Sequence, residues 1–258
     1  MAISAKDVQE LRKSTGAGMM DAKKALTEAD GDFDAAVQIL REKGLAKAAT
    51  RVDRDNTEGL VVIVENDDAA AMVHVKSETD FSAKSEDFVA LANDIAAAVL
   101  ADGEGVVAAF TERLDDLKLN IKENIELGAV VRYAKSDGAE IDAYLHGGGR
   151  AGVLVEAEGV DPETLHEIAL HIAFAKPRYL SRDEVSAAEV EKERSALLEI
   201  TKSEGKPEAA WDKIVEGRVN SWFADSVLLE QGLFGDKETV ASKVGSGKLL
   251  RFDLAMVG

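Results

Sequence analysis

Three residues in the second half of the chain come close to a zinc-protease motif. His166-Glu167 and His171 nearly spell H-E-x-x-H, in which two histidines four residues apart on one helix bind the same metal. Here the histidines are five apart, so on a helix they point about 140° away from each other. With four histidines, no cysteine and no serine elbow of the G-x-S-x-G kind, the sequence predicts no catalytic residue and no metal site.

A glycine-rich run has the spacing of a phosphate-binding loop. Gly147, Gly149 and Gly152 satisfy G-x-G-x-x-G, which lets backbone amides approach a pyrophosphate. A dinucleotide site needs a helix after the glycines, but Gly152–Val155 has the pattern of a strand. The H-R-D, D-F-G and A-P-E motifs that accompany a kinase loop are absent. We therefore expect a tight turn between two strands and no cofactor, with a nucleotide-binding transferase as the alternative.

A phenylalanine stands in a polar stretch between an expected strand and an expected helix. The stretch reads Ser77-Glu78-Thr79-Asp80-Phe81. Burial statistics favour a core or helix-staple role for Phe81 over an exposed contact. The residue types alone leave both interpretations open.

Composition excludes several classes of function. The formal net charge of −18 repels nucleic-acid phosphates and anionic lipids, so we expect no direct nucleic-acid or membrane partner. Residues 1–54 carry ten basic and nine acidic residues, so the negative charge lies in the rest of the chain. The absence of cysteine fits a reducing compartment. The N-terminus lacks a signal or transit pattern and no run is long enough to span a membrane, so we expect a cytoplasmic protein.

Residues 1–54 are expected to form a small helical domain with a linker. Start and stop signals predict three short helices. The first begins at a capping box of Ser4 and Asp7, the second begins near Met19, and the third begins at the cap Asp32 and ends at Gly44. Ala46–Asn56 has no apolar stripe and is predicted to be a linker that is partly helical.

The rest of the chain predicts two copies of one strand-and-helix unit. Strands are expected at 60–64 and 69–75, then at 125–133, 140–145 and 152–155, with helices after Ser85 and Asp161. Matching LANDIAAA with IALHIAFA pairs Ala92 with Ala169 and Ile95 with Ile172. A last strand at 249–257 could return to the core sheet.

Two further helices are expected to form a projecting hairpin. Ser186 and Glu189 mark a capping box, and Gly205-Lys206-Pro207 separates the two helices. The predicted fold is therefore α+β, with a three-helix domain followed by two related α/β subdomains that contain antiparallel strands. We expect domains at 1–54, 55–138 and 139–258, the last interrupted by the hairpin at 182–224.

Several long motifs, in order along nearly the whole chain, resemble bacterial elongation factor Ts. They are LRKSTGAGMMDAKKAL, TDFSAK, HIAFAKPRYL, VSAAEVEKE, IVEGR and the closing RFDL. That family is the guanine-nucleotide exchange factor of elongation factor Tu in translation elongation. The resemblance implies a first domain of ubiquitin-associated type, a binding protein instead of an enzyme, and elongation factor Tu as partner, both GDP-bound and nucleotide-free.

The resemblance also implies which residues touch the partner. Thr79, Asp80, Phe81 and Ser82 would enter it near its magnesium site. The first domain would dock through the set Arg12, Met19, Met20 and Lys23, and the second subdomain through His146. Met20 as a core residue and Lys23 as part of a solvated face are the alternatives. Ser82 departs from the apolar residue expected after Asp-Phe. With Gly258 as the last residue, we do not expect the extra C-terminal helical module of some members. A higher assembly through the helical hairpin, and a scaffold without exchange activity, stay open.

Overall fold

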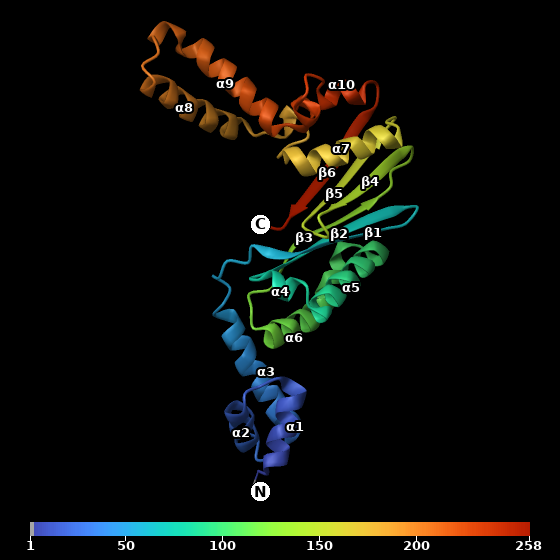
Figure 1. The fold of residues 1–258 in the computed structure, drawn as a ribbon, viewed down its shortest axis with the longest axis vertical. Helices are drawn as coiled ribbons and strands as arrows, with labels where there is room; N and C mark the ends of the chain where they lie inside the picture. The colour runs from blue at the N-terminus through green and yellow to red at the C-terminus, as the bar shows by residue number, and fades with distance from the viewer. Residues whose placement is uncertain (1–2) are drawn as a thin grey trace. The chain divides into compact units, whose positions relative to one another are not determined.

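The first helices form a small bundle with its own apolar core. The computed structural model describes residues 3–258 and contains α1 (Ala5–Thr15), α2 (Met19–Glu28) and α3 (Phe33–Ala49) (Figure 1). Ser4 and Asp7 form the expected capping box, with the Asp7 amide donating to Ser4 Oγ at 3.1 Å. Buried apolar side chains from all three helices meet in one cluster, which comprises Val8, Leu11, Ala22, Ala25, Leu26 and Ala36. Residues 1 and 2 of the expected first domain lie outside the described residues.

The expected stop at Gly44 is wrong, because α3 continues to Ala49. A Cβ added to Gly44 would lie 2.3 Å from Leu119 Cδ2 of α6 (Thr111–Ile121). Arg41 of α3 also pairs with two carboxylates of α6, Glu112 at 3.0 Å and Asp116 at 3.3 Å. Gly44 therefore permits close packing between two helices instead of ending one, and this tertiary contact overrides its low helix propensity.

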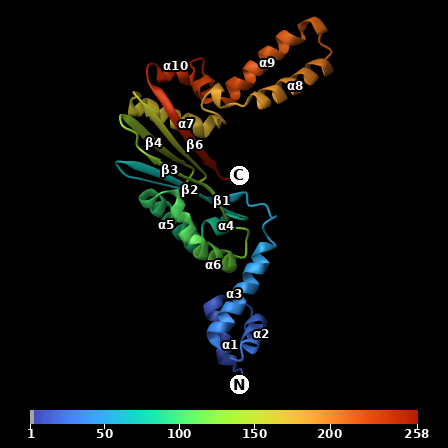
Figure 2. The same cartoon turned by 180° about the vertical axis from the view of Figure 1, so that it is seen from behind.

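The first sheet contains β1 (Glu58–Glu65), β2 (Ala69–Ser77) and β3 (Glu126–Ala134), with β2 in the middle. Asn66 closes the β1–β2 hairpin, since its Oδ1 accepts from the amides of Asp68 and Ala69. Helix α5 (Glu86–Asp102) lies along this sheet (Figure 2). Its apolar side chains Phe88, Leu91, Ile95 and Val99 are buried. A 3-10 segment, Glu104–Phe110, then leads into α6.

One short helix in this region was not predicted. Helix α4 (Asp80–Ala83) forms one turn within the polar stretch between the expected strand and the expected helix. Ser85 stands at the N-cap position of α5, but its hydroxyl donates to Ser82 O at 2.8 Å instead of accepting an amide of α5. Helix α5 therefore begins after Ser85 as expected, although Ser85 makes no side-chain cap bond and its hydroxyl instead bonds the end of α4.

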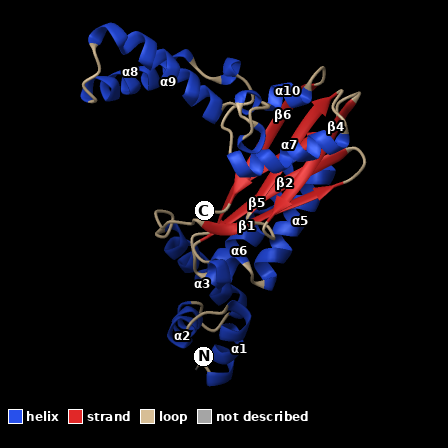
Figure 3. Ribbon diagram, turned by 45° about the horizontal axis from the view of Figure 1, so that its top comes forward, coloured by secondary structure: helices blue, strands red, loops and turns tan. Residues whose placement is uncertain are grey.

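The second sheet is antiparallel and repeats the strand order of the first. It contains β4 (Ala139–His146), β5 (Ala151–Glu158) and β6 (Lys248–Met256), with β5 in the middle and a bulge at Glu156–Ala157. Helix α7 (Pro162–Ala175) packs against β4 and β5 (Figure 3). Asp161 caps α7 by accepting the Thr164 amide at 3.0 Å. Ala92 and Ile95 of α5, and their matches Ala169 and Ile172 of α7, are all buried.

The helical hairpin consists of α8 (Ala187–Ser203) and α9 (Trp211–Ser226), which extend together away from α7 in Figure 1. Val215, Val219 and Phe223 form its inner seam. Ser186 caps α8, but Glu189 does not complete the expected box, because its carboxylate accepts from the Tyr179 hydroxyl and from Arg178. Four 3-10 turns and α10 (Val240–Val244) complete this part of the chain; the turns are Arg182–Glu184, Glu208–Ala210, Leu228–Glu230 and Leu233–Gly235.

The predicted α+β class, with helices and antiparallel strands, is confirmed. Contacts divide the chain into two compact units, one of residues 1–62, 73–130 and 257–258 and one of 63–72 and 131–256. The domain boundaries expected from the sequence stay a prediction. Between residues 3 and 258, no helix has both the length and the apolar content that a membrane span requires.

Candidate functional site

Phe81 projects into solvent from the one-turn helix α4. It is 82% exposed, the largest fraction among the exposed large apolar side chains of residues 3–258. Thr79 precedes the helix as its N-cap, and its hydroxyl oxygen accepts the Ser82 amide at 3.3 Å. The core interpretation of Phe81 is therefore wrong. An isolated exposed phenylalanine leaves apolar area in water, and such area becomes stabilising when a partner covers it.

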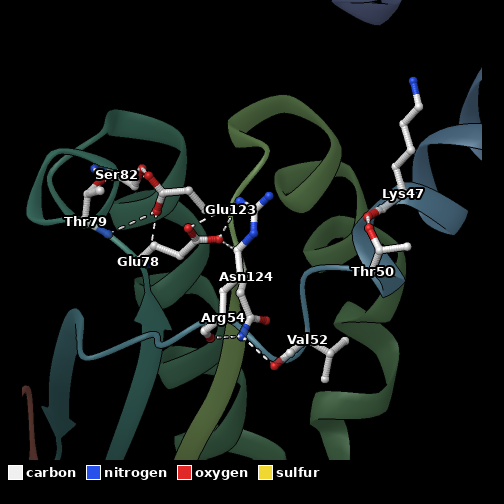
Figure 4. Close-up of polar contacts among 9 residues, drawn as sticks. All are labelled: Lys47, Thr50, Val52, Arg54, Glu78, Thr79, Ser82, Glu123 and Asn124. Carbon is white, nitrogen blue, oxygen red and sulfur yellow. Dashed lines mark hydrogen bonds and ion pairs between the residues drawn. The ribbon is translucent and has the colours of Figure 1, made fainter.

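The carboxylate of Glu123 holds the Thr79–Ser82 segment. Its Oε2 accepts the amides of Glu78 and Thr79 at 3.0 and 3.2 Å, and its Oε1 accepts the hydroxyls of Thr79 and Ser82, both at 2.7 Å (Figure 4). Charged acceptors make the stronger hydrogen bonds of proteins. Ser82, which departs from the apolar residue expected there, is thus used as a donor to Glu123.

Asn124 connects the same place to the linker after α3. Its side-chain Nδ2 donates to the carbonyls of Val52 and Arg54 at 3.1 and 2.9 Å, and its backbone N–H donates to Glu78 Oε1 at 2.6 Å (Figure 4). Arg54 Nη1 lies 3.4 Å from the Glu78 carboxylate. The linker is therefore bonded to Asn124, and the start of α4 is bonded to its neighbour Glu123.

Asp80 begins α4 and is engaged in a local ion pair. Its carboxylate accepts from Lys84 Nζ at 2.5 Å, one turn later on the surface. This hydrogen bond is the main reason that the pKa of Asp80 lies below its ordinary value. Asp80 is therefore ionised at neutral pH and accessible to a partner.

The first-domain residues expected at the partner surface are all exposed. Met19 and Met20 are 55% and 64% exposed at the start of α2, and Arg12 and Lys23 are exposed on α1 and α2. Met20 is therefore not a core residue, so that alternative is wrong. Lys23 is accessible, as both of its interpretations require. Two adjacent exposed methionines offer flexible apolar area for contact.

His146 ends β4 and is exposed in the second unit, with its Nδ1 2.7 Å from the Tyr144 hydroxyl. Directly after it, Gly147, Gly148 and Gly149 all have positive φ, of 58°, 66° and 97°. They turn β4 into β5, where His146 pairs with Ala151. The expected tight turn is confirmed, and the helix that a dinucleotide site requires does not follow the glycines.

The two histidines of α7 have different environments, as their spacing predicts. His166 is exposed beside Asp142 at 3.1 Å. His171 is buried, bonded to Gln231 Oε1 at 3.0 Å and to the Phe234 amide at 3.1 Å, and desolvation lowers its pKa. Residues 3–258 contain no cluster of His, Asp and Glu suited to hold a metal ion.

Glu123 and Asn124 were missed by the sequence reasoning. They lie at least 40 positions from α4 and follow Lys122, the C-cap residue of α6, which has a left-handed φ of 66°. A signal was present in Lys122-Glu123-Asn124, a polar run between an expected helix and an expected strand. Nothing in one sequence links that run to Thr79, because the contact depends on how the chain folds.

Comparison with known proteins agrees with the resemblance. The family model described as "Elongation factor TS" matches residues 78–252. The chain is 47% identical to elongation factor Ts of Cutibacterium acnes over 93% of each chain. It is 44% and 43% identical to the proteins of that name from Clavibacter sepedonicus and Clavibacter michiganensis, over 93% of this chain and 92% of each relative. The chain therefore belongs to the elongation factor Ts family of translation elongation factors.

Proposed function

We propose that this protein is a guanine-nucleotide exchange factor that binds elongation factor Tu carrying GDP and promotes release of the GDP. Family membership supports the partner. The observation that carries the mechanism is Phe81, 82% exposed on a helix that Glu123 braces. It acts by binding, and its own residues carry out no chemical step on the nucleotide.

The exchange step follows from differential binding. Phe81 inserts between helices of the partner, and burying its ring gains about 2–3 kcal/mol. That gain is available only in the partner conformation that opens to admit the ring, so the opened conformation becomes more populated. In that conformation the loop and magnesium that hold the nucleotide phosphates are displaced, and GDP leaves.

Docking is carried by the other exposed residues of the set. Arg12, Met19, Met20 and Lys23 of the helical bundle bind the nucleotide domain of the partner, and His146 of the second unit makes a further contact. Asp80 redirects polar contacts next to the inserted ring. Coupling between two ligands is reciprocal, so GDP lowers the affinity for this factor by the same ratio as the factor lowers the affinity for GDP. Each tenfold change in affinity corresponds to about 1.4 kcal/mol.

Stopped-flow release of labelled GDP from elongation factor Tu tests this function. The wild-type protein should accelerate release, and Phe81→Ala should abolish most of the acceleration with an unchanged melting temperature, because an exposed ring contributes little to folding. Ile200→Ala is the matched control, since Ile200 is another exposed apolar side chain, on α8, and should leave the rate unchanged. A large loss of stability in Phe81→Ala with normal exchange would contradict the proposal.

Two other functions give different results in the same set of measurements. A nucleotide-binding transferase would bind fluorescent GDP directly, whereas this factor alone should not. A scaffold would bind the GTPase without changing its rate of GDP release.

A further inference from the structure

Helix α4 is too short to keep its shape by local bonding alone. It has four residues, and a single helical turn costs more conformational entropy than its few hydrogen bonds return. Phe81 cannot stabilise it, because its ring lies largely in solvent. Contacts from elsewhere in the chain are therefore needed to fix the direction in which the ring points.

The Glu123 carboxylate makes four such contacts to this segment. Its four donors are the amides of Glu78 and Thr79 and the hydroxyls of Thr79 and Ser82, at 2.7–3.2 Å. These donors lie on both sides of Phe81 in the chain. The backbone that carries Phe81 is thus attached before and after the ring to one rigid acceptor.

Glu123 is itself held in place from two sides. On one side of Glu123, Lys122 ends α6 in the left-handed conformation. On the other side, Asn124 is only 6% exposed. Asn124 donates to Glu78 on one side and to the carbonyls of Val52 and Arg54 on the other. The turn 122–124 therefore joins the linker that follows the helical bundle to the base of α4.

We propose that Glu123 is the positioning residue of the Thr79–Ser82 segment, presenting Phe81 in its inserting orientation before the partner is met. This inference rests on the proposed exchange function. Without Glu123 the segment samples many conformations, and the fraction with the ring presented sets how many bound complexes release GDP. Docking through the helical bundle does not depend on that fraction.

The test compares Glu123→Ala, Glu123→Gln and Glu126→Ala at rising factor concentration. Glu123→Ala should lower the maximal rate of stimulated GDP release about tenfold, with the half-saturating concentration unchanged. Glu123→Gln should stay within about twofold of wild type, because its carbonyl can accept the two amides while its NH₂ group donates to the two hydroxyls. Glu126→Ala is the control, since that carboxylate bonds Asn56 at 2.9 Å and should leave the rate unchanged.

Two further readouts separate positioning from general stability. Phe81→Ala with Glu123→Ala should be no slower than Phe81→Ala alone, because Glu123 acts only through the ring. Hydrogen exchange at the amides of Glu78 and Thr79 should accelerate in Glu123→Ala while exchange in α5 stays protected. If Glu123→Ala does not fold, Ser82→Ala removes one of the four bonds and should lower the rate about threefold.

The outcomes distinguish the two proposals. If the wild-type protein does not accelerate GDP release, the exchange function itself fails. If wild type accelerates release and Phe81→Ala does not, but Glu123→Ala matches wild type, only the positioning role is overturned. A rate for Glu123→Gln as low as that of Glu123→Ala, or additive effects in the double variant, would also overturn it.

Discussion

Replacing His74 with leucine should remove part of the acid sensitivity of the fold. His74 lies on β2, the middle strand of the first sheet, and is 5% exposed. Its Nε2 has no hydrogen-bond partner among residues 3–258. Glycines flank it on both neighbouring strands, since a Cβ on Gly59 or Gly128 would lie 3.2 Å or 3.0 Å from its ring nitrogens. Burial, with a smaller effect of Lys76, lowers its pKa to about 4.

The size of the effect follows from proton linkage. An unfolded histidine has a pKa of about 6.5, so between about pH 6.5 and 4 the unfolded chain binds a proton that the folded chain does not. The folded pKa is the lower one, so this stability is fully present above pH 6.5 and is lost as pH falls towards 4. The loss is about 2 kcal/mol between pH 7 and pH 5, and about 3 kcal/mol in full.

Urea unfolding at pH 7 and pH 5, followed by circular dichroism, measures this loss. The wild-type protein should lose about 2 kcal/mol more than His74→Leu over that interval. His171, whose pKa is also lowered, remains in both proteins and cancels in the difference. Nuclear magnetic resonance should show that His74 titrates near pH 4 in the folded state. A titration midpoint near 6.5, or equal pH dependence in the two proteins, would refute the reasoning.

Two remaining predictions concern the first sheet and the helical bundle. Gly59→Ala should lower the free energy of unfolding by about 1–3 kcal/mol in urea titrations, because the new Cβ would lie 2.3 Å from the backbone oxygen of Val75. If this variant is as stable as the wild-type protein, strands β1 and β2 can move apart there and the prediction is wrong. Deleting residues 1–54 should weaken binding to elongation factor Tu in calorimetry while the remaining chain stays folded, and an unchanged dissociation constant would remove the docking role of the bundle.

Local signals in the sequence were sufficient where the structure depends on neighbours in the chain. The Ser4 capping box, the Asp161 cap of α7 and the glycine turn after His146 all form as expected. Each involves side chains and amides within four positions, so residue type and spacing determine it. The α+β class followed from the same periodic patterns.

Predictions that depend on distant contacts were incomplete or wrong. Gly44 looked like a helix end, but Leu119 packs against it from another helix. Glu189 looked like half of a capping box, but Tyr179 and Arg178 compete for its carboxylate. For Phe81, residue statistics favoured burial and only the family resemblance favoured exposure. Helix α4 was not predicted, and Glu123, which accepts from the hydroxyls of Thr79 and Ser82, lies outside any local window of sequence around it.

The two copies of the repeated unit differ in how their middle strand is joined to the helix that follows. In the second copy three residues, 159–161, suffice between β5 and α7. The first copy uses eight, 78–85, between β2 and α5. The additional length is thus not required to complete the architecture. Grafting the shorter joint into the first copy should yield a folded molecule without its protruding aromatic, so that recognition and folding could be altered separately.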